Sequence, residues 1–146
     1  IRLYTIDYGI SRNDKIIDEF PEIKIDDLSV TFNNRLLESK IVISDTNQTT
    51  YLQSLAINKP TIIFWNPEAS EIKSEVKPYI DRLMDVGIYH TSPKSAAEML
   101  SNIYPTIDEW WYSSNTQKAK NAFCEKFAYT SENWLQEWEL ALSDLK

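Results

Sequence analysis

The clearest structural signal in this sequence is residues 40–66, KIVISDTNQTTYLQSLAINKPTIIFWN. Short apolar runs rich in β-branched residues, at 41–43 and 61–64, are typical of strands in a parallel sheet that is covered on both faces. The polar residues 45–50 lie between them and are followed by a helical pattern that ends before Pro60. This order of strand, turn, helix and strand predicts a βαβ unit.

The polar turn of this unit is a candidate ligand site. In a βαβ unit such a turn lies at the carboxyl edge of the sheet, where open α/β folds bind ligands. The free backbone N–H groups of the following helix point into the same space and favour an anion. We therefore predict that the phosphate end of a ligand is held by the side chains of this turn, Asp45, Thr46, Asn47, Gln48, Thr49 and Thr50.

The same turn also fits a purely structural interpretation. Thr50 and Gln53 have the spacing of a capping box, and residues 45–49 resemble an ordinary polar loop. The turn contains no glycine, so neither the dinucleotide-binding fingerprint nor the P-loop is present. On the sequence alone, both the ligand-binding and the structural interpretation stay open.

Two further pairs of residues follow predicted strands on the same edge. Trp65 and Asn66 come after the second buried strand, where an indole ring can stack on a base or sugar, although a tryptophan packed under a loop is equally common. Tyr8 and Gly9 follow a predicted strand at 2–6, where glycine lets the backbone approach a ligand closely. These residues are therefore candidate base or sugar contacts.

The chain holds one histidine, His90, and one cysteine, Cys124. His90 ends a predicted strand on the same edge and joins the candidate base or sugar contacts, although a lone histidine is more often structural. One histidine and one cysteine do not make a metal constellation. No nucleophile elbow surrounds His90. The sequence therefore predicts no metal site and identifies no catalytic residue.

Composition narrows the class of protein. With 146 residues, of which 42% are hydrophobic and 25% charged, the chain fits one folded domain rather than a disordered segment. A formal net charge of −7 argues against binding to nucleic acid or to an anionic membrane surface, and no apolar run has the length of a membrane span. A single cysteine predicts a reducing cytoplasm. Because the sequence starts in strand-like residues without a methionine, we expect a fragment of a longer protein.

Hydrophobic periodicity predicts alternating strands and helices over the first two thirds of the chain. The predicted strands are 2–6, 22–25, 41–43, 61–64 and 88–90. The predicted helices are 14–20, 29–39, 50–58, 72–87 with a kink at Pro78, and 93–103. The fold class is therefore α/β, a Rossmann-like parallel sheet flanked by helices. We expect a single domain, 1–146, in which the α/β unit 1–104 carries a helical tail, 105–146, packed on it.

Several motifs spread over nearly the whole chain occur together in one known family. They are the run 39–65, Pro78-Tyr79 with Leu83, the segment 87–93, Ala96-Ala97, Glu109-Trp110-Trp111, Phe123, Asp7-Tyr8-Gly9, and Trp134-Leu135 with Glu137-Trp138. In this order they resemble the bacterial transferases of surface-polysaccharide (O-antigen) biosynthesis, and the double tryptophan makes the resemblance specific. Those proteins are several times longer. The chain resembles their carboxyl-terminal part, the nucleotide-sugar-binding half of a two-domain GT-B glycosyltransferase.

The resemblance implies a donor site in the turn already described. In GT-B enzymes the strand, turn and helix that match 41–58 contact the donor diphosphate, and a carboxylate early in that helix commonly holds the ribose hydroxyls. Gln53 stands at the matching position, where glutamine keeps hydrogen bonds but loses the charge-assisted ones. Residues 25–28 would lie near the base. The implied substrate is a nucleotide-sugar, and no metal or other cofactor is implied.

The resemblance also implies a partner and a mechanism. GT-B catalysis takes place between two domains, so the partner would be the missing amino-terminal domain of the same protein, and this domain alone would be inactive. Helix-end amides would stabilise the leaving diphosphate. The implied location is the cytoplasm, at the inner face of the membrane. The competing hypothesis is a catalytically silent interaction or assembly module on the same scaffold, which Gln53 and the glycine-free turn favour slightly.

Overall fold

The computed structural model describes residues 1–3 and 13–144. The chain forms two compact units, Ile1–Glu38 and Ser39–Lys146. The predicted strand at 2–6 and the candidate contacts Tyr8 and Gly9 fall mostly or wholly outside the described residues. The predicted division into 1–104 and 105–146 stays a prediction.

The first unit contains two short helices, α1 (Asn13–Glu19) and α2 (Phe32–Glu38), as the apolar periodicity predicts. The predicted strand at 22–25 is wrong, because these residues form a turn followed by irregular backbone. Nearby, the amino group of Ile1 donates to the carbonyl of Lys24, and the amide of Asp26 donates to the carbonyl of Ile1 (2.7 Å). Among the described residues these two bonds do not form a β-ladder.

Charged side chains connect the two ends of this unit. Asp26 accepts ion pairs from Arg2 (3.1 Å) and Arg35 (3.5 Å). The neighbouring Asp27 accepts from both the hydroxyl and the amide of Ser29, and these bonds lower the pKa of its carboxyl group. The acidic corner at 26–27 therefore organises a loop, and its bonds are to the protein itself.

The second unit is built on a parallel three-stranded sheet in the order β1-β2-β3. Its strands are β1 (Val42–Ser44), β2 (Thr61–Phe64) and β3 (Tyr89–His90). Val42 lies beside Thr61, and Ile63 beside Tyr89. The strands predicted at 41–43, 61–64 and 88–90 are thus confirmed to within one residue, and the fold is α/β and compatible with a Rossmann-like scaffold.

Helices connect and cover the strands of this unit. They are α3 (Thr49–Ala56), α4 (Lys77–Asp85), α5 (Pro93–Ile103), a 3₁₀ turn η1 (Tyr104–Thr106), α6 (Ile107–Trp111), α7 (Ser114–Phe127) and α8 (Trp134–Ser143). The predicted helix 72–87 is shorter than expected. It begins at Lys77, so Pro78 lies in the first turn, where the missing N–H costs nothing, and it causes no kink.

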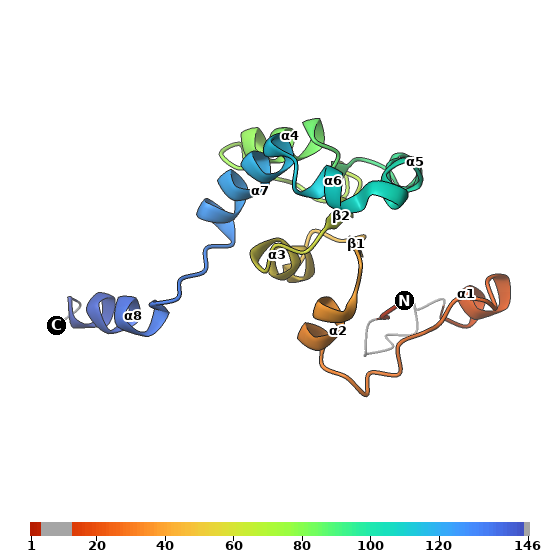
Figure 1. Cartoon of the computed structure of the whole chain (residues 1–146), viewed down its shortest axis with the longest axis horizontal. Helices are drawn as coiled ribbons and strands as arrows, with labels where there is room; N and C mark the ends of the chain where they lie inside the picture. Colours follow the sequence, from red (N-terminus) through yellow and green to blue (C-terminus); the bar gives the residue numbers. More distant parts are fainter. Residues whose placement is uncertain (4–12, 145–146) are drawn as a thin grey trace. The chain divides into compact units, whose positions relative to one another are not determined.

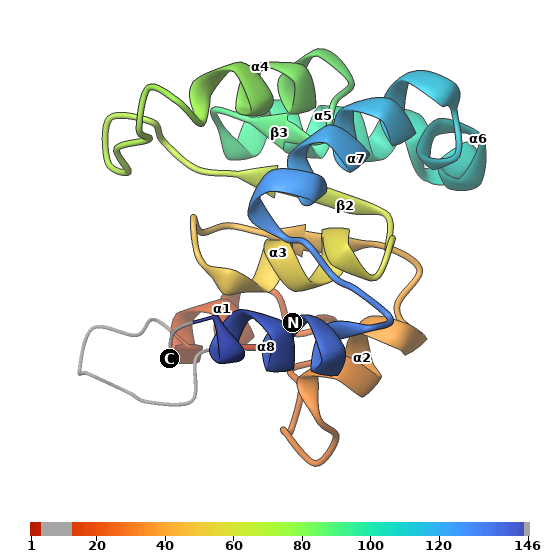
Figure 2. The same ribbon diagram turned by 90° about the vertical axis from the view of Figure 1, so that its left-hand side faces the viewer.

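The sheet has a hydrophobic core on each face, because successive residues of a strand point in opposite directions. Ile63 packs with residues of α3, α4 and α7, whereas Ile62 packs with residues of α5 and α6. Both isoleucines are fully buried. Two perpendicular views agree that α7 runs beside α4 (Figure 1; Figure 2). Burial on both faces explains why β2 is an uninterrupted apolar run.

The double tryptophan lies at the far ends of α3 and α4. Each helix ends in a Schellman motif with a left-handed residue, Asn58 (φ 57°) after α3 and Gly87 (φ 75°) after α4. Trp111 Nε1 donates to the carbonyl of Asn58 (3.0 Å), and Trp110 Nε1 donates to that of Val86 (2.9 Å). These two indoles therefore bind the C-terminal ends of α3 and α4, which lie away from the candidate site.

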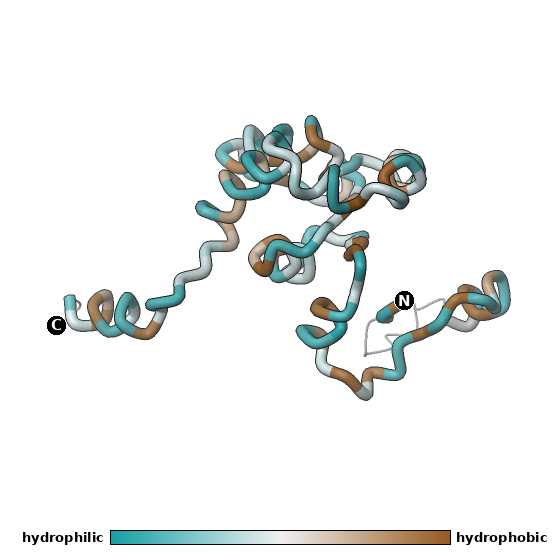
Figure 3. The backbone as a smooth tube through the Cα atoms, viewed as in Figure 1, coloured by the Kyte–Doolittle hydropathy of each residue, from teal (hydrophilic) through white to brown (hydrophobic). Residues whose placement is uncertain are grey.

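The last helix, α8, contains no buried residue. Figure 3 shows hydrophobic residues interspersed with hydrophilic ones along it. Trp134 and Trp138 are 60% and 61% exposed. Among the described residues, no helix combines the length and the apolar character needed to cross a membrane.

Candidate functional site

The candidate site is built where β1 ends and α3 begins. Gln48 is the N-cap residue of α3, with an extended backbone (φ −129°, ψ −172°), and its side chain makes no capping hydrogen bond. The amides in the first turn of a helix have no partner within the helix. Here they are left uncapped at the carboxyl edge of the sheet. The predicted start of the helix is confirmed to within one residue.

One part of the structural interpretation of this turn, the Thr50–Gln53 capping box, is wrong, whereas the other part, an ordinary polar loop at 45–49, stays open. Helix α3 begins at Thr49, so Thr50 already lies inside the first turn and has no N-cap role. Four of the side chains predicted to bind phosphate are exposed to solvent: Asp45, Thr46, Gln48 and Thr49. None of the four forms a side-chain hydrogen bond to another described residue. Thr50 is half-buried, and Gln53 is exposed one turn further along the helix, on the face of Thr49.

Asn47 differs from its neighbours, because its side chain is used to hold the turn. Its Nδ2 donates to Ser70 Oγ (3.3 Å), and its Oδ1 accepts from the hydroxyl of Tyr51 (3.1 Å). Burial raises the pKa of the Tyr51 phenol, which is protonated at neutral pH in any case and so acts as a donor. Asn47 therefore connects the turn to α3 and to the segment that follows β2.

A cavity of about 320 Å³ lies beside this turn. Its lining comes from the start of α3, the end of β2, the connection 66–76, α4 and α7. Asn47 and Lys73 contribute polar groups, and Tyr51 and Phe123 contribute rings. Sequence reasoning missed Lys73, which lies 28 positions after Asp45 in an irregular connection where no motif marks it. The structure thus places the exposed lysine near the predicted anion site, together with the exposed carboxylate of Glu71 in the same lining.

Trp65 lies inside the core, with 5% of its surface exposed. Its ring lies against Tyr89 (4.3 Å between ring centroids) and Tyr51 (5.7 Å). Its Nε1 atom is buried and has no hydrogen-bond partner among the described residues. The neighbouring Asn66 is exposed, and its Oδ1 accepts from the amide of Glu68 (2.9 Å). The indole ring is therefore packed at a tilt against two tyrosine rings, and Trp65 is among the residues that line the cavity.

His90 is half-buried at the end of β3. Its Nε2 lies 3.1 Å from the carbonyl oxygen of Gly87, and its own carbonyl accepts from the amide of Trp65 (3.3 Å).

Burial raises the pKa of the Cys124 thiol on α7. Within residues 1–3 and 13–144, no group of His, Cys, Asp and Glu side chains is arranged to hold a metal ion.

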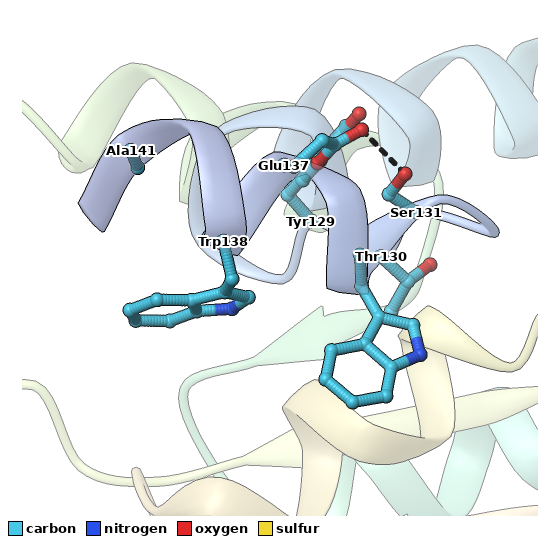
Figure 4. A pocket seen from close by; sticks show the side chains of 7 residues that line it. Tyr129, Thr130, Ser131, Glu137, Trp138 and Ala141 are labelled. Carbon is cyan, nitrogen blue, oxygen red and sulfur yellow. Dashed lines mark hydrogen bonds between the residues drawn. The ribbon is translucent and has the colours of Figure 1, made fainter. Parts of the chain in front are cut away.

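A second, more open hollow of about 490 Å³ lies along α8 and the residues before it. It is lined by Tyr129, Trp134, Trp138 and Ala141, and Ser131 donates a hydrogen bond to Glu137 at its border (Figure 4). The lining combines three exposed aromatic side chains with the polar residues Thr130, Ser131 and Glu137.

The fold and the turn together define a class: an α/β protein with a parallel sheet and an uncapped helix N-terminus at the sheet's carboxyl edge, suited to anions. The chain belongs to the LIC12162 family of transferases, since the family model described as LIC12162 family transferase matches residues 1–142. No curated protein and no solved structure matches the chain.

Proposed function

We propose that this chain binds the donor of a glycosyltransferase reaction and holds the diphosphate of a nucleotide-sugar at the N-terminus of α3. The single observation that carries this proposal is the uncapped start of α3 at the carboxyl edge of a parallel sheet, in a member of a transferase family. A helix start that the protein does not cap itself has amides available for a phosphate.

The proposed mechanism is electrostatic. Bond cleavage at the sugar leaves negative charge on the diphosphate, and the amides of Thr49, Thr50 and Tyr51 are oriented before the reaction to receive that charge. The hydroxyl groups of Thr46 and Thr49 add donors. Asp45 and Gln53 carry oxygen acceptors that suit the hydroxyl groups of sugar or ribose rather than the phosphate.

The wider assignment rests on the sequence resemblance. It implies a GT-B enzyme of bacterial surface-polysaccharide biosynthesis, whose amino-terminal domain supplies the acceptor site and the catalytic base, in the cytoplasm. The transferase family and the α/β scaffold are consistent with this assignment. On this view the present chain binds the donor and does not turn it over alone.

Thr49→Pro tests the role of the helix amides. Thr49 is the first residue of α3 and follows an extended Gln48, so proline fits there and removes one free N–H without breaking the helix. We expect UDP, GDP or CMP, or their sugar conjugates, to bind about tenfold more weakly, since a hydrogen bond to a charged group contributes about 1.5–3 kcal/mol. Chemical-shift titration measures the affinity.

Thr49→Ala is the matched control, because it removes the hydroxyl and keeps the amide. We expect about threefold weaker binding for this variant, because a neutral hydroxyl contributes a hydrogen bond near the low end of the usual range of about 0.5–1.5 kcal/mol. Circular dichroism checks that α3 is retained in both variants. Equal affinity of parent, Thr49→Pro and Thr49→Ala would place the phosphate elsewhere and refute the proposal.

The exposed side chains of α8 favour a second candidate function, an interaction or assembly module. Trp134, Leu135 and Trp138 are each more than half exposed. Aromatic residues of this kind are enriched in the centres of protein interfaces. If millimolar nucleotides and nucleotide-sugars cause no chemical-shift change around Thr46–Gln53, this second function replaces the first.

A further inference from the structure

Helix α8 is too short to be stable without a surface that covers it. It has 10 residues, and none of them is buried. Isolated helices of fewer than about 12–15 residues are only marginally stable in water, and most helices in proteins are stabilised by packing an apolar face. The helix therefore needs an apolar surface to pack on.

The apolar side chains of α8 gather on one face. At 3.6 residues per turn, Trp134, Trp138 and Leu142 lie above one another, with Leu135 beside them. Each of these four residues is more than half exposed. Figure 4 shows the two indoles projecting from the same side of the helix. Apolar anchors three and four residues apart are the pattern of a helix that lies in a hydrophobic groove.

The charges of α8 narrow the kind of surface that can cover it. Glu137 and Glu139 border the apolar face on its two sides, and the helix carries no lysine or arginine. An anionic membrane surface would repel these carboxylates, because helices that bind such membranes carry cations on their polar face. The chemistry of α8 therefore requires a protein groove with an apolar floor and a basic rim.

The cavity of about 320 Å³ beside α3 has these properties at one of its ends. Phe127, the last residue of α7, lines the cavity and meets the ring of Tyr79 edge-on (5.2 Å between ring centroids). The Arg82 guanidinium and the Lys126 ammonium each lie 5.6 Å from the centre of that tyrosine ring. Both residues are exposed. Two cations therefore lie beside the Phe127 end of the cavity.

The two surfaces carry opposite charges. Helix α7 has three lysines and one glutamate, whereas α8 has two glutamates and no cation. In the lining of the cavity itself, Lys73 and Glu71 offset each other, so the surplus of positive charge lies at the Phe127 end. Complementary charge of this kind selects a partner and fixes its orientation. The cavity falls within the volume range of pockets that bind small aromatic groups, and an indole is such a group.

We infer that α8 of one copy of this chain docks in this cavity of a second copy, with Trp138 inserted and its flanking glutamates beside Arg82 and Lys126. The exchange is reciprocal, as in a two-fold symmetric dimer. An aromatic side chain buries about 150–250 Å² in full. The four tryptophans of two helices therefore supply a substantial part of the roughly 1,200–2,000 Å² of a stable interface. The inference goes beyond the proposed function and does not depend on it.

A second copy is favoured over the same chain as the occupant. The connection 128–133 is short, and Phe127 at its start lines the cavity, so α8 is tethered next to the cavity of its own chain. A short tether gives an effective concentration in the millimolar range. If the direction of the connection allowed it, α8 would already be packed there. Instead α8 has no buried residue.

The first test measures association of the intact 146-residue chain by sedimentation velocity over a range of concentrations. We expect a dimer, and for Trp138→Ala a dissociation constant at least tenfold higher, because tryptophans dominate the energy of many interfaces. Leu140→Ala is the matched control: Leu140 is exposed on the opposite side of α8 and should leave the dimer unchanged. A chain that is monomeric at every concentration, or that loses the dimer equally in both variants, would overturn the inference.

The second test exchanges the charges of the two surfaces. Arg82→Glu with Lys126→Glu makes the rim of the cavity acidic, and Glu137→Lys with Glu139→Lys makes α8 basic. Each double variant alone should dimerise at least tenfold more weakly, because like charges then meet. An equimolar mixture should recover the affinity of the parent, since every helix in the mixed dimer meets a rim of opposite charge. Circular dichroism checks that both variants are folded. A mixture that stays dissociated would show that α8 meets another surface.

Two monomeric outcomes would each overturn the inference. Protection of the Trp138 indole N–H from solvent exchange would mean that α8 packs on its own chain, and rapid exchange would mean that its partner is a different protein. Neither outcome affects the α3 site, which Thr49→Pro tests without changing α8. Loss of nucleotide binding in an intact dimer would remove the proposed function alone.

Discussion

Two helices of this protein begin at the same edge of the same sheet and differ in how they begin. Helix α5 follows β3, and the Oγ atom of its N-cap residue Ser92 accepts a hydrogen bond from the amide of Ser95 (3.2 Å). Helix α3 follows β1, and its N-cap residue Gln48 forms no such bond. Pro93 also removes one amide from the first turn of α5.

The difference shows two ways in which a helix starts at this edge. In α5 a serine and a proline satisfy or remove the free donors, which stabilises the protein. In α3 no side chain of the N-cap residue satisfies them, and Asn47 holds the preceding turn through Ser70 and Tyr51. Helices α4, α6 and α8 also start without a side-chain cap, so the missing cap alone does not identify a site. What distinguishes α3 is that its start follows strand β1 after one short polar turn.

The largest effect on nucleotide affinity is expected when the N-terminus of α3 is given a side-chain cap like that of α5. Gln48→Asp places a carboxylate at the N-cap, where it accepts from the amides of the first turn and repels a phosphate. We expect nucleoside diphosphate affinity to fall more than tenfold while the free energy of unfolding rises by about 1 kcal/mol. Titration calorimetry and urea unfolding measure the two quantities. An unchanged affinity in a stabilised variant would contradict the role we assign to these amides.

An intermediate effect, on stability alone, is expected when the side-chain cap of α5 is removed. Ser92→Ala removes the cap on the amide of Ser95, so the free energy of unfolding should fall by about 1 kcal/mol. Nucleotide affinity should not change, because α5 carries no proposed ligand contact. Urea unfolding and the same titration check both statements. Weaker nucleotide binding by Ser92→Ala would show that the start of α5 also contributes to the ligand site, which contradicts the assignment of that site to α3.

The smallest effect is expected when the turn before α3 is loosened. Asn47→Ala removes the partly exposed bonds to Ser70 and Tyr51, so the free energy of unfolding should fall by about 0.5 kcal/mol. Ser70→Ala, which removes one of the two bonds, is the matched control and should cost less. Thermal unfolding measures both. A loss above 2 kcal/mol would mean that the turn is a structural cap and not a ligand site.

The sequence was sufficient for the parts of the fold that depend on local patterns. The strands β1, β2 and β3 were predicted because short apolar runs bounded by turn residues favour strands over helices. Ser92 and Pro93 likewise predict the start of α5, because a cap and an N1 proline act within one turn. The strand expected at 22–25 failed because a strand requires a partner, which a local pattern does not specify.

The candidate site was predictable only in part, for the same reason. The position of the turn 45–50 could be predicted from the βαβ order. The cavity could not, because it depends on which side chains of α7 and of the connection 66–76 pack beside α3. Lys73 carries no local signal. For Trp65 the sequence left ligand stacking and packing under a loop equally open, and the structure packs it in the core against two tyrosines distant in sequence.

The indole of Trp111 has a consequence for how the protein is made. It holds the carbonyl of Asn58 across 53 residues of sequence. A ribosome delivers the phosphate-binding turn, α3 and Lys73 well before it delivers this tryptophan. The emerging chain therefore carries the candidate turn and α3 while α3 still lacks its distal anchor. Helix α7, which supplies Phe123 and Phe127 of the cavity wall, is made later still. The proposed donor site therefore reaches its final geometry only after both α6 and α7 have left the exit tunnel.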